Sequence, residues 1–123
     1  MKKYILIVLL GFLVACSADI ELKVDQLKET EEVAKLVDAK SVRVAKLNNS
    51  LITVVIDGRA PLNMSIDERG ILARKIVEVC LEAAKDAPGI LILFTNKDEA
   101  GSGSFHYNWS MKEAKFVDVI KSS

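Results

Sequence analysis

The pattern of hydrophobic and polar positions is clearest between Ser65 and Gly89, where a start signal, a periodic body and a stop signal follow one another. Ser65 and Glu68 have the spacing of a capping box, in which a hydroxyl and a carboxylate each bind a free backbone N–H. Apolar residues then recur at steps of three and four, namely Ala73, Ile76, Val77, Cys80, Ala83 and Ala84. Pro88 ends the pattern, because proline cannot continue helical hydrogen bonding. The segment therefore predicts one long amphipathic helix that packs on a core.

Two apolar runs of strand length flank this helix. Residues 51–56 read LITVVI and residues 90–95 read ILILFT, as expected for strands that are buried on both sides. Residues 42–47 alternate ahead of an Asn-Asn-Ser turn, which predicts a first hairpin. Residues 105–109 alternate after a polar loop, which predicts a second hairpin. Because both central runs are apolar throughout, we expect the second face of the sheet to be covered by the first helix, the terminal segment or a partner.

The two ends of the chain have weaker patterns. Residues 17–24 alternate as a short edge strand does, and residues 25–40 have helical spacing with many charges, which predicts a largely exposed first helix. Ser110 and Glu113 form a second capping-box pattern that favours a terminal helix. The β-branched residues 116–120 leave a strand as the alternative. The sequence thus predicts an α+β fold with a mainly antiparallel sheet of about four strands in two hairpins, one long capped helix on a face, and shorter N- and C-terminal helices.

The first sixteen residues read MKKYILIVLLGFLVAC and combine a basic start with an apolar run of twelve residues. A membrane-spanning helix needs about 20 apolar residues, so the run favours the core of a signal peptide. Its last four residues, Leu13-Val14-Ala15-Cys16, are similar at every position to the lipobox of bacterial lipoproteins. An ordinary secretory signal with a coincidental cysteine is the alternative.

The lipoprotein resemblance implies a lipid on the Cys16 thiol and cleavage after Ala15. It also implies acylation, for example by palmitate, which gives stable anchoring to a membrane. Ser17 in place of an aspartate favours the outer membrane, facing the periplasm, in a Gram-negative cell. The expected organisation is a cleaved signal peptide at 1–15, a lipidated N-terminus and tether at 16–24, and one small domain at 25–123. No family resemblance extends beyond the signal.

Length, charge and cysteine content limit the remaining classes of function. Removal of residues 1–15 from the 123-residue chain leaves 108 residues, enough for one core. This part has 15 basic and 17 acidic side chains without a basic block, which argues against nucleic-acid binding. With Cys16 lipidated, Cys80 has no disulfide partner, and its place on the apolar helix face favours burial over reactivity.

His106, the only histidine, is the one candidate for proton transfer or metal binding. In a strand it shares a face with Asn108 and Ser110. The chain has no His/Cys cluster at ligand spacing, so no metal or cofactor is expected. A solvent-facing or hydrogen-bonded histidine is the favoured interpretation.

Phe105, Tyr107 and Trp109 occupy the opposite face of the same strand. Packing of these rings against the long helix is the favoured interpretation. The alternative is an exposed aromatic surface that binds a partner. The preceding loop, residues 101–104, reads Gly-Ser-Gly-Ser and lacks the lysine and the following helix of a phosphate-binding loop.

No catalytic constellation is present in the pattern, so the sequence favours a non-enzymatic, lipid-anchored envelope protein. Such a protein would act as a binding, scaffold or accessory subunit for a protein or cell-wall partner. The alternative is a small periplasmic enzyme or ligand carrier that uses the face with His106, Asn108 and Ser110.

Overall fold

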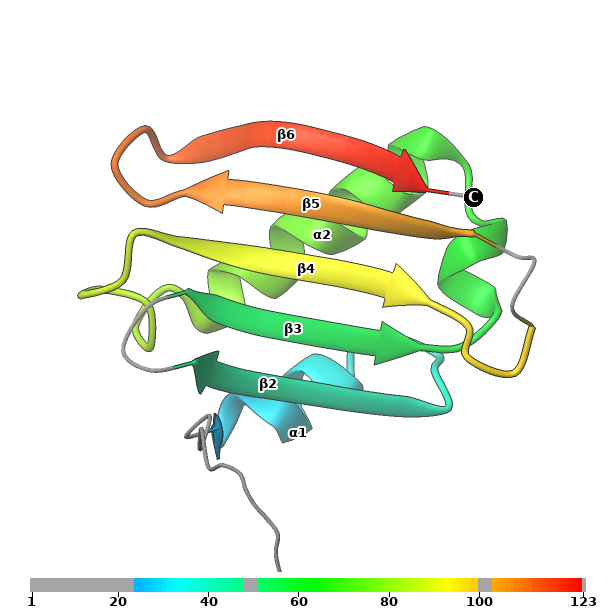
Figure 1. Ribbon diagram of the computed structural model, residues 1–123, viewed down its shortest axis with the longest axis horizontal. Helices are drawn as coiled ribbons and strands as arrows, with labels where there is room; N and C mark the ends of the chain where they lie inside the picture. The colour runs from blue at the N-terminus through cyan, green and yellow to red at the C-terminus, as the bar shows by residue number, and fades with distance from the viewer. Residues whose placement is uncertain (1–23, 48–50, 100–102, 123) are drawn as a thin grey trace, which may run out of the picture.

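A computed structural model describes residues 24–47, 51–99 and 103–122. The signal peptide, Cys16, the tether up to residue 23 and the expected turn at 48–50 lie outside these ranges. The described chain forms an α+β fold in which one mixed sheet has the order β1-β2-β3-β4-β5-β6. The strands are β1 (Val24–Gln26), β2 (Ser41–Leu47), β3 (Ile52–Asp57), β4 (Gly89–Thr95), β5 (Ser104–Ser110) and β6 (Lys115–Ser122) (Figure 1).

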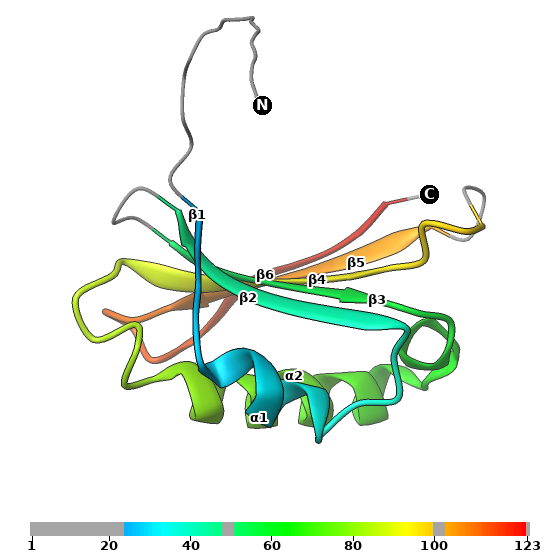
Figure 2. The ribbon, with the colours of Figure 1, turned by 90° about the horizontal axis from the view of Figure 1, so that it is seen from below.

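Three helical elements connect the strands: α1 (Glu29–Ala34), the 3-10 helix η1 (Ala60–Asn63) and α2 (Ile66–Cys80). Figure 2 shows that α1 and α2 lie on the same face of the sheet. The core fills the space between α2 and this face. Its largest fully buried side chains on the strands and α2 are Val44, Ile52, Val54, Ile56, Ile76, Val77, Cys80, Ile90, Ile92 and Phe94.

The capping box and the two hairpins are confirmed. The Ser65 hydroxyl accepts from the Glu68 N–H at 3.1 Å, and the Glu68 carboxylate accepts from the Ser65 N–H at 3.1 Å. β2 pairs antiparallel with β3, and β4 pairs antiparallel with β5. α2 ends at Cys80, earlier than Pro88 suggested, and residues 81–86 form turns.

The expected sheet is correct in part, since every strand pairing except one is antiparallel. It has six strands and not about four. It is also a mixed sheet, because β3 and β4 pair in parallel, with Ile52 opposite Ile90 and Asp57 opposite Thr95. A helical crossover carries the chain from the end of β3 back to the start of β4, which makes the two strands run in the same direction. The apolar composition of both runs fits a parallel pair as well as an internal antiparallel one. Local sequence therefore did not distinguish the two arrangements.

The predicted C-terminal helix is wrong, because residues 115–122 form the edge strand β6. The Ser110 hydroxyl does accept from the Glu113 N–H at 3.1 Å, as a cap would. The chain then reverses at Ala114, which has a φ of 56°. A capping signal here begins a tight turn, and Phe116 returns to pack on Trp109 with ring centroids 5.1 Å apart.

The expected first helix is also shorter than residues 25–40. Val24–Gln26 pairs with β2, and only Glu29–Ala34 is α-helical. The Thr30 hydroxyl fixes α1 to the sheet by accepting from the Val44 N–H at 3.1 Å. Since α1 packs beside α2 and the terminal segment is a strand, neither covers the second face of the sheet.

Gly89, at the start of β4, lies too close to the backbone of β5 to carry a side chain. A Cβ atom placed there would lie 2.4 Å from the Trp109 carbonyl oxygen, whereas a Cβ on Gly70 in α2 would have no heavy atom within 4 Å. We expect Gly89→Ala to lower the free energy of unfolding by about 1–3 kcal/mol through overpacking. We expect Gly70→Ala to raise it by about 0.5–1 kcal/mol through helix propensity.

Denaturant unfolding of the two variants beside the unsubstituted chain measures both effects. The steric argument for Gly89 fails if the two alanine variants change stability in the same direction and by a similar amount.

Candidate functional site

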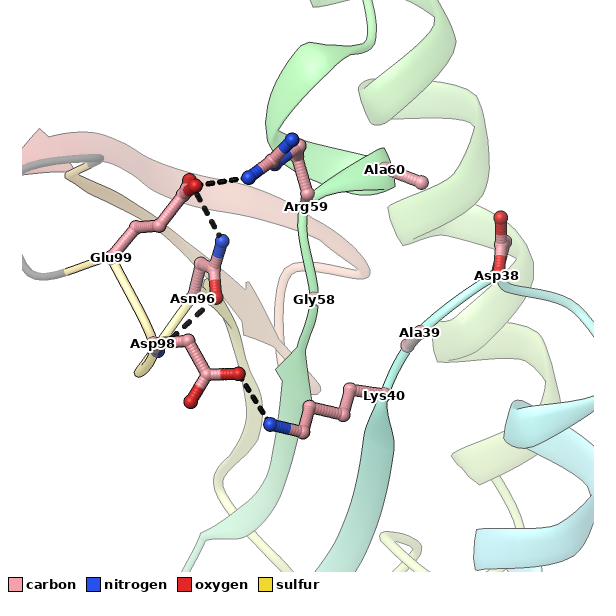
Figure 3. Close-up of a pocket in the computed structure, with 9 residues that line it drawn as sticks. All are labelled: Asp38, Ala39, Lys40, Gly58, Arg59, Ala60, Asn96, Asp98 and Glu99. Atoms are coloured by element: carbon pink, nitrogen blue, oxygen red, sulfur yellow. Dashed lines mark hydrogen bonds and ion pairs between the residues drawn. The ribbon is translucent and has the colours of Figure 1, made fainter.

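A polar cavity of about 410 Å³ lies where the carboxyl ends of β3 and β4 meet the start of β2 (Figure 3). Ligand sites commonly occur beyond the carboxyl ends of parallel strands. We call this feature the strand-end cavity; its lining consists of Asp38, Ala39, Lys40, Gly58, Arg59, Ala60, Asn96, Asp98 and Glu99.

Gly58 lines the strand-end cavity, and Asp57 precedes it at the end of β3. The buried Asp57 carboxylate accepts from the Lys97 N–H at 2.8 Å, and the Gly58 N–H donates to the Thr95 carbonyl at 2.8 Å. A Cβ on Gly58 would come within 3.0 Å of Ala39 Cα, so the chain approaches closely here. These contacts hold the ends of β3 and β4 together with the segment that enters β2.

Asn96 shapes the loop that follows β4. Its side-chain oxygen accepts from the Asp98 N–H at 3.2 Å, and its side-chain nitrogen donates to a Glu99 carboxylate oxygen at 3.2 Å. The Glu99 N–H also donates to the Asn96 carbonyl at 3.1 Å. This local turn directs the Asp98 and Glu99 carboxylates toward the cavity.

Two ion pairs cross the mouth of the cavity, Lys40 with Asp98 and Arg59 with Glu99 (Figure 3). The hydrogen bond and the negative charge of Asp98 raise the pKa of Lys40. All four side chains are exposed, so each pair contributes little to stability. Their position matters more, because they join the loop after β4 to the segment that enters β2 and to the segment that leaves β3.

The described residues contain no group of three His, Cys, Asp or Glu side chains placed to hold a metal ion. In the same ranges, no helix is long and apolar enough to cross a membrane.

The structure places the aromatic stripe of β5 mainly in the core. Tyr107 is 3% exposed and Trp109 is 5% exposed, and Phe94 meets Tyr107 edge to face at a centroid distance of 5.6 Å. Phe105 is half-buried beneath the Arg69 guanidinium, which lies 3.6 Å from its ring centroid. Tyr107 and Trp109 therefore do not form the exposed binding surface that was the alternative interpretation.

His106 lies on the face of β5 that points away from the helices. It is half-buried, and its Nε2 lies 3.4 Å from the Ser104 hydroxyl. Its neighbours across the strands are Leu93 and Ile120. Asn108 shares this face, but the Ser110 hydroxyl is engaged by the Glu113 N–H. The described residues show no hydrogen bond that joins His106, Asn108 and Ser110 into a catalytic unit.

Sequence reasoning missed Arg69, a buried arginine at the start of α2. Its guanidinium donates to the carbonyls of Pro61 at 3.0 Å, Leu62 at 3.3 Å and Met64 at 2.7 Å. A buried charge is stable only when hydrogen-bonded in this way. Helical spacing offered a signal, since Arg69 is one turn before the buried Ala73. The role of Arg69 is to hold η1 on α2.

Sequence reasoning also missed the strand-end cavity. Lys40 ends the segment predicted as the first helix, and Arg59 and Asn96 lie in connections between predicted elements, so no local pattern marked them as a site. A signal existed, since polar residues follow both central apolar runs. It becomes interpretable only when β3 and β4 are known to be parallel, because their carboxyl ends then meet at one edge.

Comparisons with protein-family models, with curated proteins and with solved structures give no match for this chain.

Asp57 and Asp98, the two aspartates near the ends of β3 and β4, should contribute unequally to the free energy of unfolding. Asp57→Ala removes a buried acceptor from the Lys97 N–H, so we expect a loss of about 1.5–3 kcal/mol in the free energy of unfolding. Asp98→Ala removes an exposed ion pair, so we expect a loss of at most about 1 kcal/mol. Urea unfolding of both variants tests the order. A larger loss for Asp98→Ala would show that the exposed network, and not the buried acceptor, holds the strand ends together.

The buried Cys80 thiol makes the stability of the fold depend on pH in the alkaline range. Burial, followed by the negative charge of Glu29, raises the pKa of the Cys80 thiol from 9.0 to about 12. Above pH 9 the thiol ionises in the unfolded chain but stays protonated in the folded chain. Its contribution to stability is therefore complete below pH 9 and is lost as the pH rises toward 12. We expect the stability advantage of the unsubstituted chain over Cys80→Ala to shrink across this interval, as measured by unfolding at fixed pH values. An advantage that stays constant from pH 8 to pH 11 contradicts it.

Proposed function

We propose that this chain is a lipid-anchored protein of the bacterial cell envelope that acts by binding, as a scaffold or accessory subunit, and not as an enzyme. The observation that carries the proposal is Leu13-Val14-Ala15-Cys16, placed directly after a basic start and a short apolar run. The lipid is attached at Cys16, and in a Gram-negative cell the domain faces the periplasm from the outer membrane. Its partner is a protein or a cell-wall component.

Two features of the described domain support a binding role. Four charged side chains around the strand-end cavity are engaged with one another, Lys40 with Asp98 and Arg59 with Glu99. On the outer side of α2, Ile66 is 80% exposed and Ile71 is 59% exposed. Large exposed aliphatic side chains that gather on one surface are typical of contact sites.

The enzyme or ligand-carrier alternative uses His106, Asn108 and Ser110. The three residues share a strand face, but the neighbours of His106 on this face are Leu93 and Ile120. General acid–base catalysis needs a partner within hydrogen-bond reach of the reacting proton. No observation on the described residues favours this alternative over binding.

The anchor is tested by expressing the full chain in bacteria supplied with an alkyne analogue of palmitate. We expect label on the protein and its recovery in the membrane fraction. Cys16→Ser should remove both the label and the processing after Ala15, while Cys80→Ala serves as the matched control and keeps both. An unlabelled wild-type chain, or a Cys16→Ser chain that is still labelled, contradicts the proposal.

A further inference from the structure

The face of the sheet that points away from α1 and α2 has an apolar centre, and we call it the open face. Strand pairing places Arg43, Val55, Leu93, His106 and Ile120 in one row across β2 to β6. The next row contains Ala45, Thr53, Leu91, Asn108 and Asp118. The side chains at the centre of the open face are not part of the hydrophobic core that lies between the sheet and the helices.

An uncovered antiparallel sheet normally carries polar residues on its outer face. The open face instead has Val55, Leu91 and Leu93 at its centre, and Ile120 is 47% exposed at its border. None of the described helices lies on this face of the sheet (Figure 2). The composition is that of a face that packs on another protein surface.

We infer that the open face packs on the open face of a second copy of this chain, forming a twofold sheet-on-sheet dimer. The axis of this dimer lies between the two faces and runs close to parallel with β4. This choice of axis rests partly on the proposed lipid anchor, whereas the self-association itself rests on the open face.

The first argument for a second copy is charge. Arg43 on β2 and Asp118 on β6 are exposed at opposite borders of the open face, and neither makes an ion pair with another described residue. A twofold axis parallel to the central strand β4 places β2 of one copy over β6 of the other. Arg43 of one copy and Asp118 of the other then lie in neighbouring rows, which are about 7 Å apart along the strand direction. An arginine side chain can span this offset. The symmetry forms this pair twice.

The second argument is the position of the tether. Val24, at the start of β1, pairs with Leu47 at the end of β2, and β1 begins on the side of the sheet away from the helices (Figure 2). Rotation about an axis parallel to the strands leaves a residue's position along the strands unchanged. Both copies of Val24 therefore lie at the same end of the dimer. Cys16 is eight residues before Val24, and an extended chain of that length spans at most about 28 Å. The two anchors can then enter one membrane.

The size of the open face is also sufficient. Five strands spaced about 4.8 Å apart, with about six residues of about 3.3 Å each, give a face of roughly 480 Å². Two such faces together give roughly 960 Å², close to the lower limit of about 1,000 Å² for a biological interface. Val55, Leu91 and Leu93, at the centre of this face, are half-buried in the single chain.

The test uses two full-length copies with different epitope tags, co-expressed and crosslinked in intact membranes before detergent is added. One tag is isolated, and the yield of the other is measured. We expect Arg43→Asp in both copies, or Asp118→Arg in both copies, to lower the yield at least tenfold, because like charges then face each other. Combining Arg43→Asp in one copy with Asp118→Arg in the other restores two opposite-charge pairs and should restore the yield. Lys75→Glu, a charge reversal at an exposed position of α2, should leave the yield unchanged.

Rescue by the mixed combination is specific to contact between two copies, since no single foreign partner requires the two reversals on different chains. Leu93→Lys, at the centre of the face, should also abolish recovery of the second tag. Absence of the second tag with the wild-type chain overturns the inference, as does a mixed combination that stays as low as the single reversals. A different protein or lipid crosslinked to this face in place of the second tag also overturns it. Lipid labelling at Cys16 is read separately, so failure of the anchor and failure of the dimer are distinguishable.

Discussion

The structure depends on the packing of α2 across β3 and β4. A parallel pair of strands requires a crossover, and here η1 and α2 provide it. The buried face of α2, with Ile76, Val77 and Cys80 fully enclosed, removes apolar surface from water on the helix and on both central strands at once. Without this contact β4 has no reason to return beside β3. The strand-end cavity and the open face are both consequences of that return.

Arg69 shows how the crossover is fixed at its beginning. The carbonyls of η1 and of the entry to α2 need donors, and one guanidinium supplies three hydrogen bonds from within the fold. The same group lies on the ring of Phe105, which joins the start of α2 to β5. A buried cation is costly when any of its donors lacks an acceptor. The geometry of η1, with Pro61 buried in its first turn, is thus coupled to the packing of β5.

Sequence pattern was sufficient wherever the determining interactions are local. The capping box of Ser65 and Glu68, the apolar stripe of α2 and the two hairpins follow from residues close together in the chain. Sequence pattern was insufficient where the structure of a segment depends on contacts with residues far away in the chain. The same Ser-x-x-Glu spacing begins a helix at Ser65 and a tight turn at Ser110, and only the pairing of residues 115–122 with β5 separates the two outcomes. The parallel direction of β4, the burial of Arg69 and the meeting of Lys40 with Asp98 are likewise non-local.

The proposed anchor changes what the open face must supply energetically. An interface near the lower size limit would dissociate readily between dilute molecules in solution. Copies attached to one membrane by short tethers are confined to a thin layer, and this raises their effective concentration without any new contact. Charge pairs at the borders, such as Arg43 with Asp118, then serve mainly to select the orientation, because mismatched orientations bring like charges or unpaired charges together. Under these conditions a modest apolar centre and two charge pairs are enough to hold the copies in one arrangement. That arrangement leaves the outer side of α2, with Ile66 and Ile71, directed away from the dimer contact.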